Sequence, residues 1–155
     1  MNDVSLEISL RSVKIVVFNA TPQTNWYCAL MTDEDGVQTV VEFSCGDSSK
    51  IVAQLIVDFV MANEGIRIRH LSDLDRLLGI DSIFDGRTDI AVMRSAIANG
   101  LIQIRSFKDQ MSVQNFLGGS GSKSVDLYAN INRSLFATNR SPVAFAEMAV
   151  RAVNL

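Results

Sequence analysis

The chain has 155 residues, of which 48% are hydrophobic and 20% are charged, a balance that is typical of a globular protein and excludes an intrinsically disordered one. Its formal net charge is −3 and its basic residues are scattered, so we expect no nucleic-acid partner. Two cysteines and one histidine give a zinc site almost no ligands, and we expect a reduced cytoplasmic protein with no signal peptide and no membrane partner.

Three strands are predicted first. Residues Leu6–Phe18 are rich in β-branched side chains, and a change in the phase of their alternation at Arg11-Ser12 suggests a bulge. A polar segment with a proline, residues 19–25, predicts a loop before a second strand at Trp26–Thr32. A turn signal of acidic residues and glycine then precedes a third strand at 37–43. These short connections predict a three-stranded antiparallel meander.

Helices follow the predicted meander. The first begins near Ser49, carries a wide apolar face and ends at Asn63-Glu-Gly65. A short helix at 72–78 is expected to be capped by Ser72, with Asp75 three residues further on.

A longer helix is predicted at 89–107, and Asn99-Gly100 in its middle argues against a straight helix. One more helical turn is predicted at 112–116. The residues of the longer helix that are expected to face inward are Ile90, Met93, Ile97, Leu101 and Ile104.

A Gly-Ser run at 118–122 separates two architectures. It is either an engineered flexible linker or a natural turn, and we favour the natural turn because the following segment continues the same pattern. A strand at 125–131 and a helix at 141–153, with a Ser-Pro start, form one β/α unit of a TIM-type barrel. We therefore expect an α+β domain at 1–119 and part of a barrel at 120–155.

Phe116-Leu-Gly-Gly119, the strand Val125-Asp-Leu-Tyr-Ala-Asn-Ile-Asn-Arg133 and the order of elements resemble the mandelate racemase and muconate lactonizing group of the enolase superfamily. The resemblance covers essentially the whole chain, and within the group the chain looks most like the acid-sugar dehydratases. It implies a capping domain over a modified β/α barrel. It also implies a lyase or isomerase that abstracts a proton next to a carboxylate while magnesium holds the enolate.

The catalytic residues of that group are not found in this sequence. In the family a base, often in a Lys-x-Lys pair, follows the second barrel strand, and metal-binding carboxylates lie on the third to fifth strands. This chain has no Lys-x-Lys, and Asp126 lies inside the first strand, where it cannot serve as a ligand. We therefore expect no catalytic residue, no metal ligand and no cofactor in this chain, with magnesium expected for the full-length family enzyme, and we leave open whether the chain itself is an enzyme.

Substrate selection is the role that the resemblance implies for this chain. It implies that two loops, Thr21–Trp26 and Cys45–Ser48, fold over the barrel mouth and select the substrate. Thr24 and Asn25 could hydrogen-bond a polyhydroxy acid, and Trp26 could close over it, with Cys45 in the second loop. The alternative is that Trp26 is simply the first buried residue of its strand.

Further candidate residues lie at the end of the predicted barrel strand. Asn130, Asn132 and Arg133 stand where barrel active sites are built, and Arg133 could pair with a substrate carboxylate. The alternative for Arg133 is a solvated surface residue. The chain also departs from the group, because Gln110 and Ser112 stand where a Gly and a Pro are usual.

Two functions are compatible with these features. The first is the N-terminal capping portion of a magnesium-dependent enzyme that acts on a small carboxylate or acid-sugar substrate, not catalytically competent alone. The alternative is a non-catalytic, self-associating or partner-binding module derived from that domain. We expect a homo-oligomer, because a lone barrel strand has unpaired edges that invite association.

Overall fold

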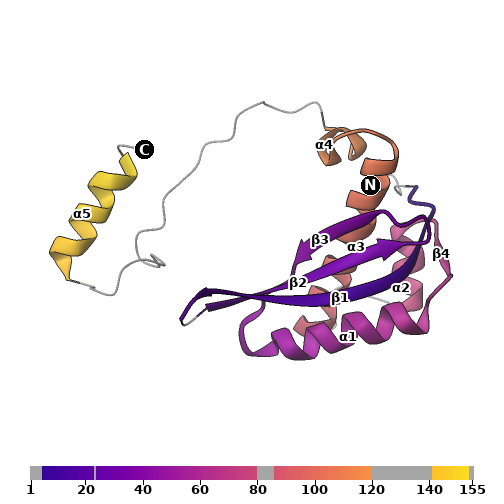
Figure 1. Ribbon diagram of the computed structural model, residues 1–155, viewed down its shortest axis with the longest axis horizontal. Helices are drawn as coiled ribbons and strands as arrows, with labels where there is room; N and C mark the ends of the chain where they lie inside the picture. Colours follow the sequence, from indigo (N-terminus) through magenta and orange to yellow (C-terminus); the bar gives the residue numbers. More distant parts are fainter. Residues whose placement is uncertain (1–4, 23, 80–85, 120–140, 154–155) are drawn as a thin grey trace. The chain divides into compact units, whose positions relative to one another are not determined.

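The computed structural model of the protein describes residues 5–22, 24–79, 86–119 and 141–153. The chain divides into two compact units, Met1–Ser120 and Gly121–Leu155. The described residues of the first unit form an α+β fold, which confirms the predicted fold class at this level (Figure 1). No helix among the described residues has both the length and the apolarity to cross a bilayer.

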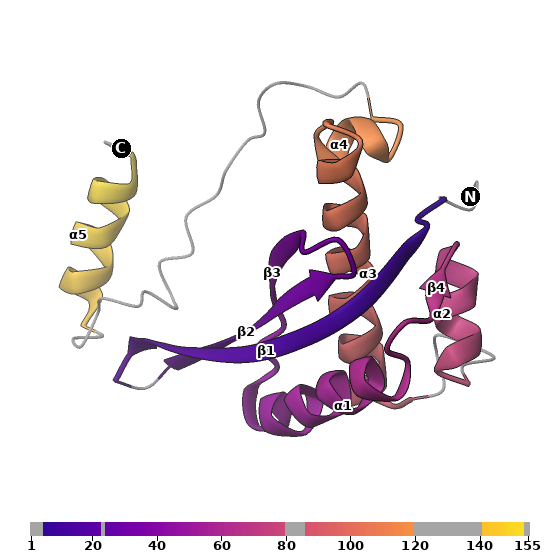
Figure 2. The same ribbon diagram turned by 45° about the vertical axis from the view of Figure 1, so that its right-hand side comes forward.

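The first unit contains a four-stranded antiparallel sheet in the order β3-β2-β1-β4. Its first three strands are the predicted meander, and β1 and β2 form a long twisted hairpin (Figures 1 and 2). The predicted bulge is confirmed, since the register of β1 against β2 shifts between Leu10 and Ser12. The strands are β1 (Ile8–Thr21), β2 (Thr24–Asp33), β3 (Gln38–Glu42) and β4 (Arg67–Ile68).

Two features of the sheet differ from the sequence prediction. The predicted loop at 19–25 is largely strand, because Asn19 pairs with Asn25 across the hairpin and its Nδ2 donates to Asn25 Oδ1 at 2.9 Å. β4 was not predicted at all. It has only two residues, which pair with Ile8 and Ser9 at the start of β1, so its sequence is too short to show an alternation.

The predicted helices are present in the described residues. The residues expected to face inward on α3 are buried, except Ile90, which is partly buried. The apolar face of α1 is narrower than predicted, because Ile51 is exposed and Leu55 is only partly buried; its buried apolar residues are Val52, Ile56, Phe59 and Val60. The helical segments are η1 (Gly46–Ser48), α1 (Ser49–Ala62), α2 (Leu71–Leu77), α3 (Thr88–Lys108), α4 (Val113–Phe116) and α5 (Pro142–Val153).

The predicted cap of α2 is wrong. The helix begins one residue earlier than expected, so His70 is the N-cap residue and Asp73, not Asp75, lies three residues on. The Asp73 carboxylate accepts from the backbone N–H of Arg69 at 3.0 Å and of His70 at 3.1 Å. The hydrogen bond from Arg69, followed by those from His70 and Arg76, lowers the pKa of Asp73. Asp75 instead pairs with Arg94 of α3.

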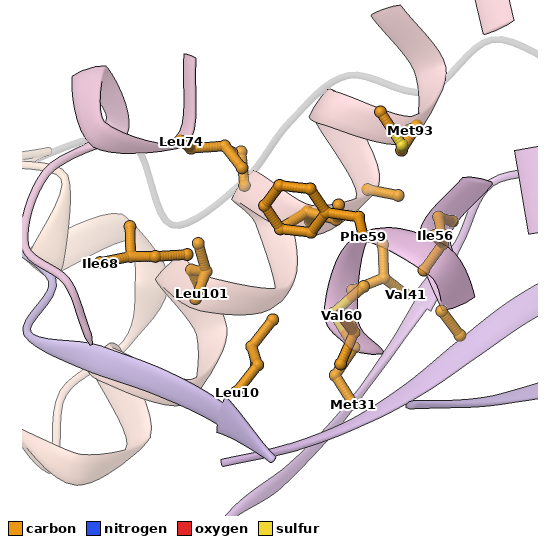
Figure 3. Close-up of a cluster of buried hydrophobic side chains, with 14 of the residues drawn as sticks. Leu10, Met31, Val41, Ile56, Phe59, Val60, Ile68, Leu74, Met93 and Leu101 are labelled. Atoms are coloured by element: carbon orange, nitrogen blue, oxygen red, sulfur yellow. The ribbon is translucent and has the colours of Figure 1, made fainter. Parts of the chain in front are cut away.

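One hydrophobic core lies between the sheet and the helices (Figure 3). It combines side chains of the β2 and β3 face that carries Met31 and Val41 with those of α1, α2 and α3. Truncating a fully buried residue such as Ile56 to alanine typically costs about 2–5 kcal/mol. The core residues labelled in Figure 3 are Leu10, Met31, Val41, Ile56, Phe59, Val60, Ile68, Leu74, Met93 and Leu101.

Gly100 lets α3 approach the sheet closely. A Cβ at this position would lie 2.5 Å from Met31 Sδ and 3.6 Å from Val41 Cγ2. Because α3 is unbroken from Thr88 to Lys108, this glycine is explained by packing and does not interrupt the helix.

A buried carboxylate joins the β2–β3 turn to the end of α3. Asp33 is fully buried, and its Oδ1 accepts from the backbone N–H groups of Asp35 at 3.0 Å and Val37 at 2.7 Å. Lys108 Nζ donates to Asp33 Oδ2 at 2.9 Å and also pairs with Asp35. The sheet and α3 are thus held together by charge as well as by the core.

The chain turns sharply after α3. Gln110 has φ of 54°, in the left-handed region that favours glycine, and the N–H of Met111 donates to Ser106 O at 3.0 Å. Ser112 then caps the predicted helical turn, since its Oγ accepts from Asn115 N–H at 3.1 Å. The backbone at Gln110 therefore suits the glycine that the resembled group usually has there.

In the second unit the structure describes α5. The predicted helix and its start are confirmed, because Ser141 Oγ accepts from Ala144 N–H at 3.2 Å and Pro142 is the first helical residue. The predicted strand at 125–131 and the nature of the run at 120–122 lie outside the described residues.

Candidate functional site

A hollow of about 550 Å³ lies where the β1–β2 hairpin meets the connection from β3 to α1. The hairpin extends past the end of β3, because β3 pairs with β2 only between Cys28 and Thr32 (Figure 2). The edge of β2 beyond this pairing forms one wall. The residues that line the hollow are Thr24, Asn25, Trp26, Tyr27, Glu42, Ser44, Gly46, Asp47 and Lys50.

Hydrogen bonds around Tyr27 bring the two walls together. The N–H of Phe43 donates to Tyr27 O at 2.9 Å, and the N–H of Tyr27 donates to Ser44 Oγ at 2.9 Å. The rings of Tyr27 and Phe43 lie 6.1 Å apart between centroids with an interplanar angle of 54°. The N–H of Ser44 donates to Glu42 Oε1 at 2.8 Å, so both residues are held beside the edge of β2.

A tight turn shapes the second wall. Ser49 is buried, its Oγ donates to Gly46 O at 2.8 Å, and the same Oγ accepts from Cys45 N–H at 2.9 Å. Gly46 has φ of 63°, which is readily adopted only by glycine. The turn places Asp47, in η1, and Lys50, in the first turn of α1, beside the hollow.

The structure brings together three of the site residues expected from the sequence. Thr24, Asn25 and Trp26 all line the hollow. Trp26 is 46% exposed, so the alternative that it is a buried strand residue is wrong. By strand alternation Trp26 lies on the sheet face opposite Ala29 and Met31, the two β2 residues that belong to the core.

Among the remaining expected residues, Cys45 is described by the structure and does not line the hollow. Cys45 lies between two lining residues, but its side chain is partly buried against the core. Asn130, Asn132 and Arg133 lie outside the described residues.

Four lining residues were not predicted from the sequence: Tyr27, Glu42, Ser44 and Lys50. A signal existed for Glu42, because strand alternation places it on the opposite face from Val41 and Phe43. For Lys50, at the start of a helix, a solvated side chain was the simpler expectation.

The lining is polar and carries both signs of charge. Glu42 and Asp47 supply carboxylates, and Lys50 supplies an ammonium group. Burial raises the pKa of the Cys28 thiol, and the charge of Glu42, its partner in the β2–β3 register, raises it further. Cys28 therefore stays a protonated thiol at neutral pH and is unsuited to act as a nucleophile.

Chemically, the hollow is equipped to bind a hydroxylated molecule. Side chains of Thr24, Asn25 and Ser44 can both donate and accept hydrogen bonds, and Trp26 offers a flat apolar surface. Within the described ranges, no group of three or more His, Cys, Asp or Glu side chains is arranged to hold a metal ion. The lining alone thus supports binding and not a reaction step.

No family model matches the chain, and a search of curated proteins finds no match either. The function is therefore inferred from the residues of the hollow and from the resemblance in the sequence.

Proposed function

We propose that this chain is the substrate-capping portion of a magnesium-dependent enolase-superfamily enzyme, a lyase or racemase acting on a small carboxylate, with acid sugars as the favoured class. In this proposal the hollow contacts the part of the substrate remote from the reacting carbon. The base and the magnesium ligands belong to the barrel.

The observation that supports this proposal is that the start of β2, at the tip of the β1–β2 hairpin, and the connection from β3 to α1 meet in one hollow. The resemblance implies substrate-selecting roles for Thr21–Trp26 and Cys45–Ser48, and residues of both segments line the same cavity. The left-handed backbone at Gln110, where the group usually has glycine, is a second point of agreement.

The hollow has a binding role in this proposal and no catalytic one. Glu42 and Asp47 are its only carboxylates among the described residues, which is fewer than the ligand set of a magnesium centre in this group. The residues present do not fit the metal, so we derive no step through it. Contacts remote from the reacting carbon contribute by positioning the substrate, which affects the rate as well as the affinity.

A fluorescence titration tests the proposed function. Trp26 is the only tryptophan of the chain and lines the hollow, so its emission reports on binding there. Addition of D-gluconate should produce a saturable change at millimolar concentrations. Asn25→Ala should weaken the binding, whereas Gln114→Ala, an exposed change on α4, should leave it unaltered. Absence of any saturable change in the native chain would contradict the proposal.

A self-associating module remains a second candidate function, and one observation favours it. Phe18, Trp26 and Val40 are 52%, 46% and 55% exposed on the sheet face opposite Met31 and Val41, and exposed apolar side chains on one face can form an interface. Light scattering over a concentration range tests this candidate. A concentration-dependent mass that falls in Val40→Lys would support it, and a monomer at every concentration would rule it out.

A further inference from the structure

We infer that the hollow accepts the neutral, hydroxylated end of an acid sugar and discriminates against a second carboxylate at that end. This inference rests on the proposed function and narrows the substrate class to monoacids, as opposed to diacids.

The charges that line the hollow carry the argument. Two carboxylates, those of Glu42 and Asp47, against the one ammonium group of Lys50 leave the lining with one net negative charge. Among the described residues, no ion pair neutralises any of the three. All three residues are exposed, so their charged groups are accessible to a molecule that binds in the hollow.

The carboxylates of Glu42 and Asp47 bind hydroxyl groups of a ligand better than they bind an anionic group. A carboxylate accepts strong hydrogen bonds from hydroxyl donors, and only one oxygen of Glu42 accepts from Ser44 N–H. The side chains of Thr24 and Asn25 can satisfy further hydroxyl groups, while the Trp26 ring covers the C–H surface between them.

A second carboxylate on the ligand would be bound less well than a hydroxyl group. It cannot donate hydrogen bonds, and it would lie in the same hollow as two like charges with one ammonium group to offset them. Lys50 alone could pair with it, but Asp47 lies only one helical turn earlier on the same wall. We expect a diacid to bind at least about tenfold more weakly than the matching monoacid at low salt, a difference of about 1.4 kcal/mol.

Three probes with the same carbon skeleton test the inference by Trp26 fluorescence: D-glucitol, D-gluconate and D-glucarate. The first two should bind within about threefold of each other, because the hydroxylated end is common to both, and D-glucarate should be at least about tenfold weaker. The difference should shrink as salt is added. Binding of D-glucarate as tight as that of D-gluconate would overturn the inference while leaving the proposed function intact.

Charge variants give a second measurement. In Glu42→Gln with Asp47→Asn, D-glucarate should approach D-gluconate to within about threefold, and Lys50→Gln should widen the gap. Glutamine at position 42 still accepts from Ser44 N–H, and circular dichroism checks the fold. An unchanged ratio in the single Lys50→Gln variant, whose exposed side chain is not required for folding, would count against the inference. If no probe alters Trp26 emission, the proposed function itself fails.

Discussion

Removing the ammonium group of Lys108 should destabilise the fold strongly. Lys108→Met keeps the length of the aliphatic chain but leaves Asp33 Oδ2, fully buried, without the donor at 2.9 Å. Oδ1 retains the backbone N–H groups of Asp35 and Val37, so part of the charge stays compensated. Loss of one charged hydrogen bond to a buried carboxylate predicts a decrease of about 2–3 kcal/mol in the free energy of unfolding.

Urea denaturation followed by circular dichroism measures this change. Asp35→Asn is the comparison, because the Asp35 carboxylate also pairs with Lys108 but is exposed, so its loss should cost less than about 1 kcal/mol. Combining Asp33→Asn with Lys108→Met should restore part of the loss, since the neutral amide needs no counter-charge and its oxygen still accepts from the two N–H groups, while its Nδ2 lacks the partner that Oδ2 had. A loss below about 0.5 kcal/mol in Lys108→Met would refute the reasoning, because it would mean that Asp33 needs no counter-charge.

The cluster of Asp33, Asp35 and Lys108 makes the stability of the fold depend on pH in the alkaline range. The hydrogen bonds to Asp35 and Asp33 raise the pKa of Lys108. The stabilisation is therefore fully present below the unfolded pKa of about 10.4 and is lost as the pH rises through the higher folded pKa. Lys108→Met should remove this alkaline dependence.

Three further variants test the fold. Gln110→Gly should stabilise the protein by about 0.5–1 kcal/mol in thermal or urea melts, because its φ of 54° strains a residue with a Cβ; a loss would contradict this. In Asp73→Asn, the loss of stability between about pH 5 and pH 2 should be smaller than in the native protein. Because the pKa of Asp73 is lowered in the folded state, its carboxylate stabilises the fold above the unfolded pKa of about 3.9, and this stabilisation is lost as the pH falls. An unchanged acid profile would argue against this reasoning. Gly100→Leu should cost about 1–3 kcal/mol by collision with Met31, whereas the exposed Asn99→Ala should not, and equal melts would refute the packing argument.

The sequence predicted the parts of the fold that depend on long local patterns. The apolar periodicity of α1 and α3, the bulge at Arg11-Ser12 and the Ser-Pro start of α5 are all visible in single segments of the chain, and the described residues contain them. β4 and the cap of α2 depend instead on pairing with β1 and on the residue at which the first helical turn begins. In such short elements a single tertiary contact determines where the element begins, and the secondary-structure propensity of the residues does not.

The site was predictable only in part for a similar reason. Thr24, Asn25 and Trp26 were expected through the resemblance, and they line the hollow. Glu42 and Lys50 join them because long-range hydrogen bonds, such as that from Tyr27 N–H to Ser44 Oγ, fold the end of β3 beside the hairpin. No local pattern shows which side chains will converge across such a distance in sequence.

Chemical-shift mapping on the ¹⁵N-labelled chain, titrated with D-gluconate, tests whether the hollow is the binding site for a hydroxylated acid. We expect saturable shifts confined to the amides of 24–27 and 42–50, which belong to the two walls of the hollow. Shifts that appear elsewhere, or no shifts at all, would contradict it.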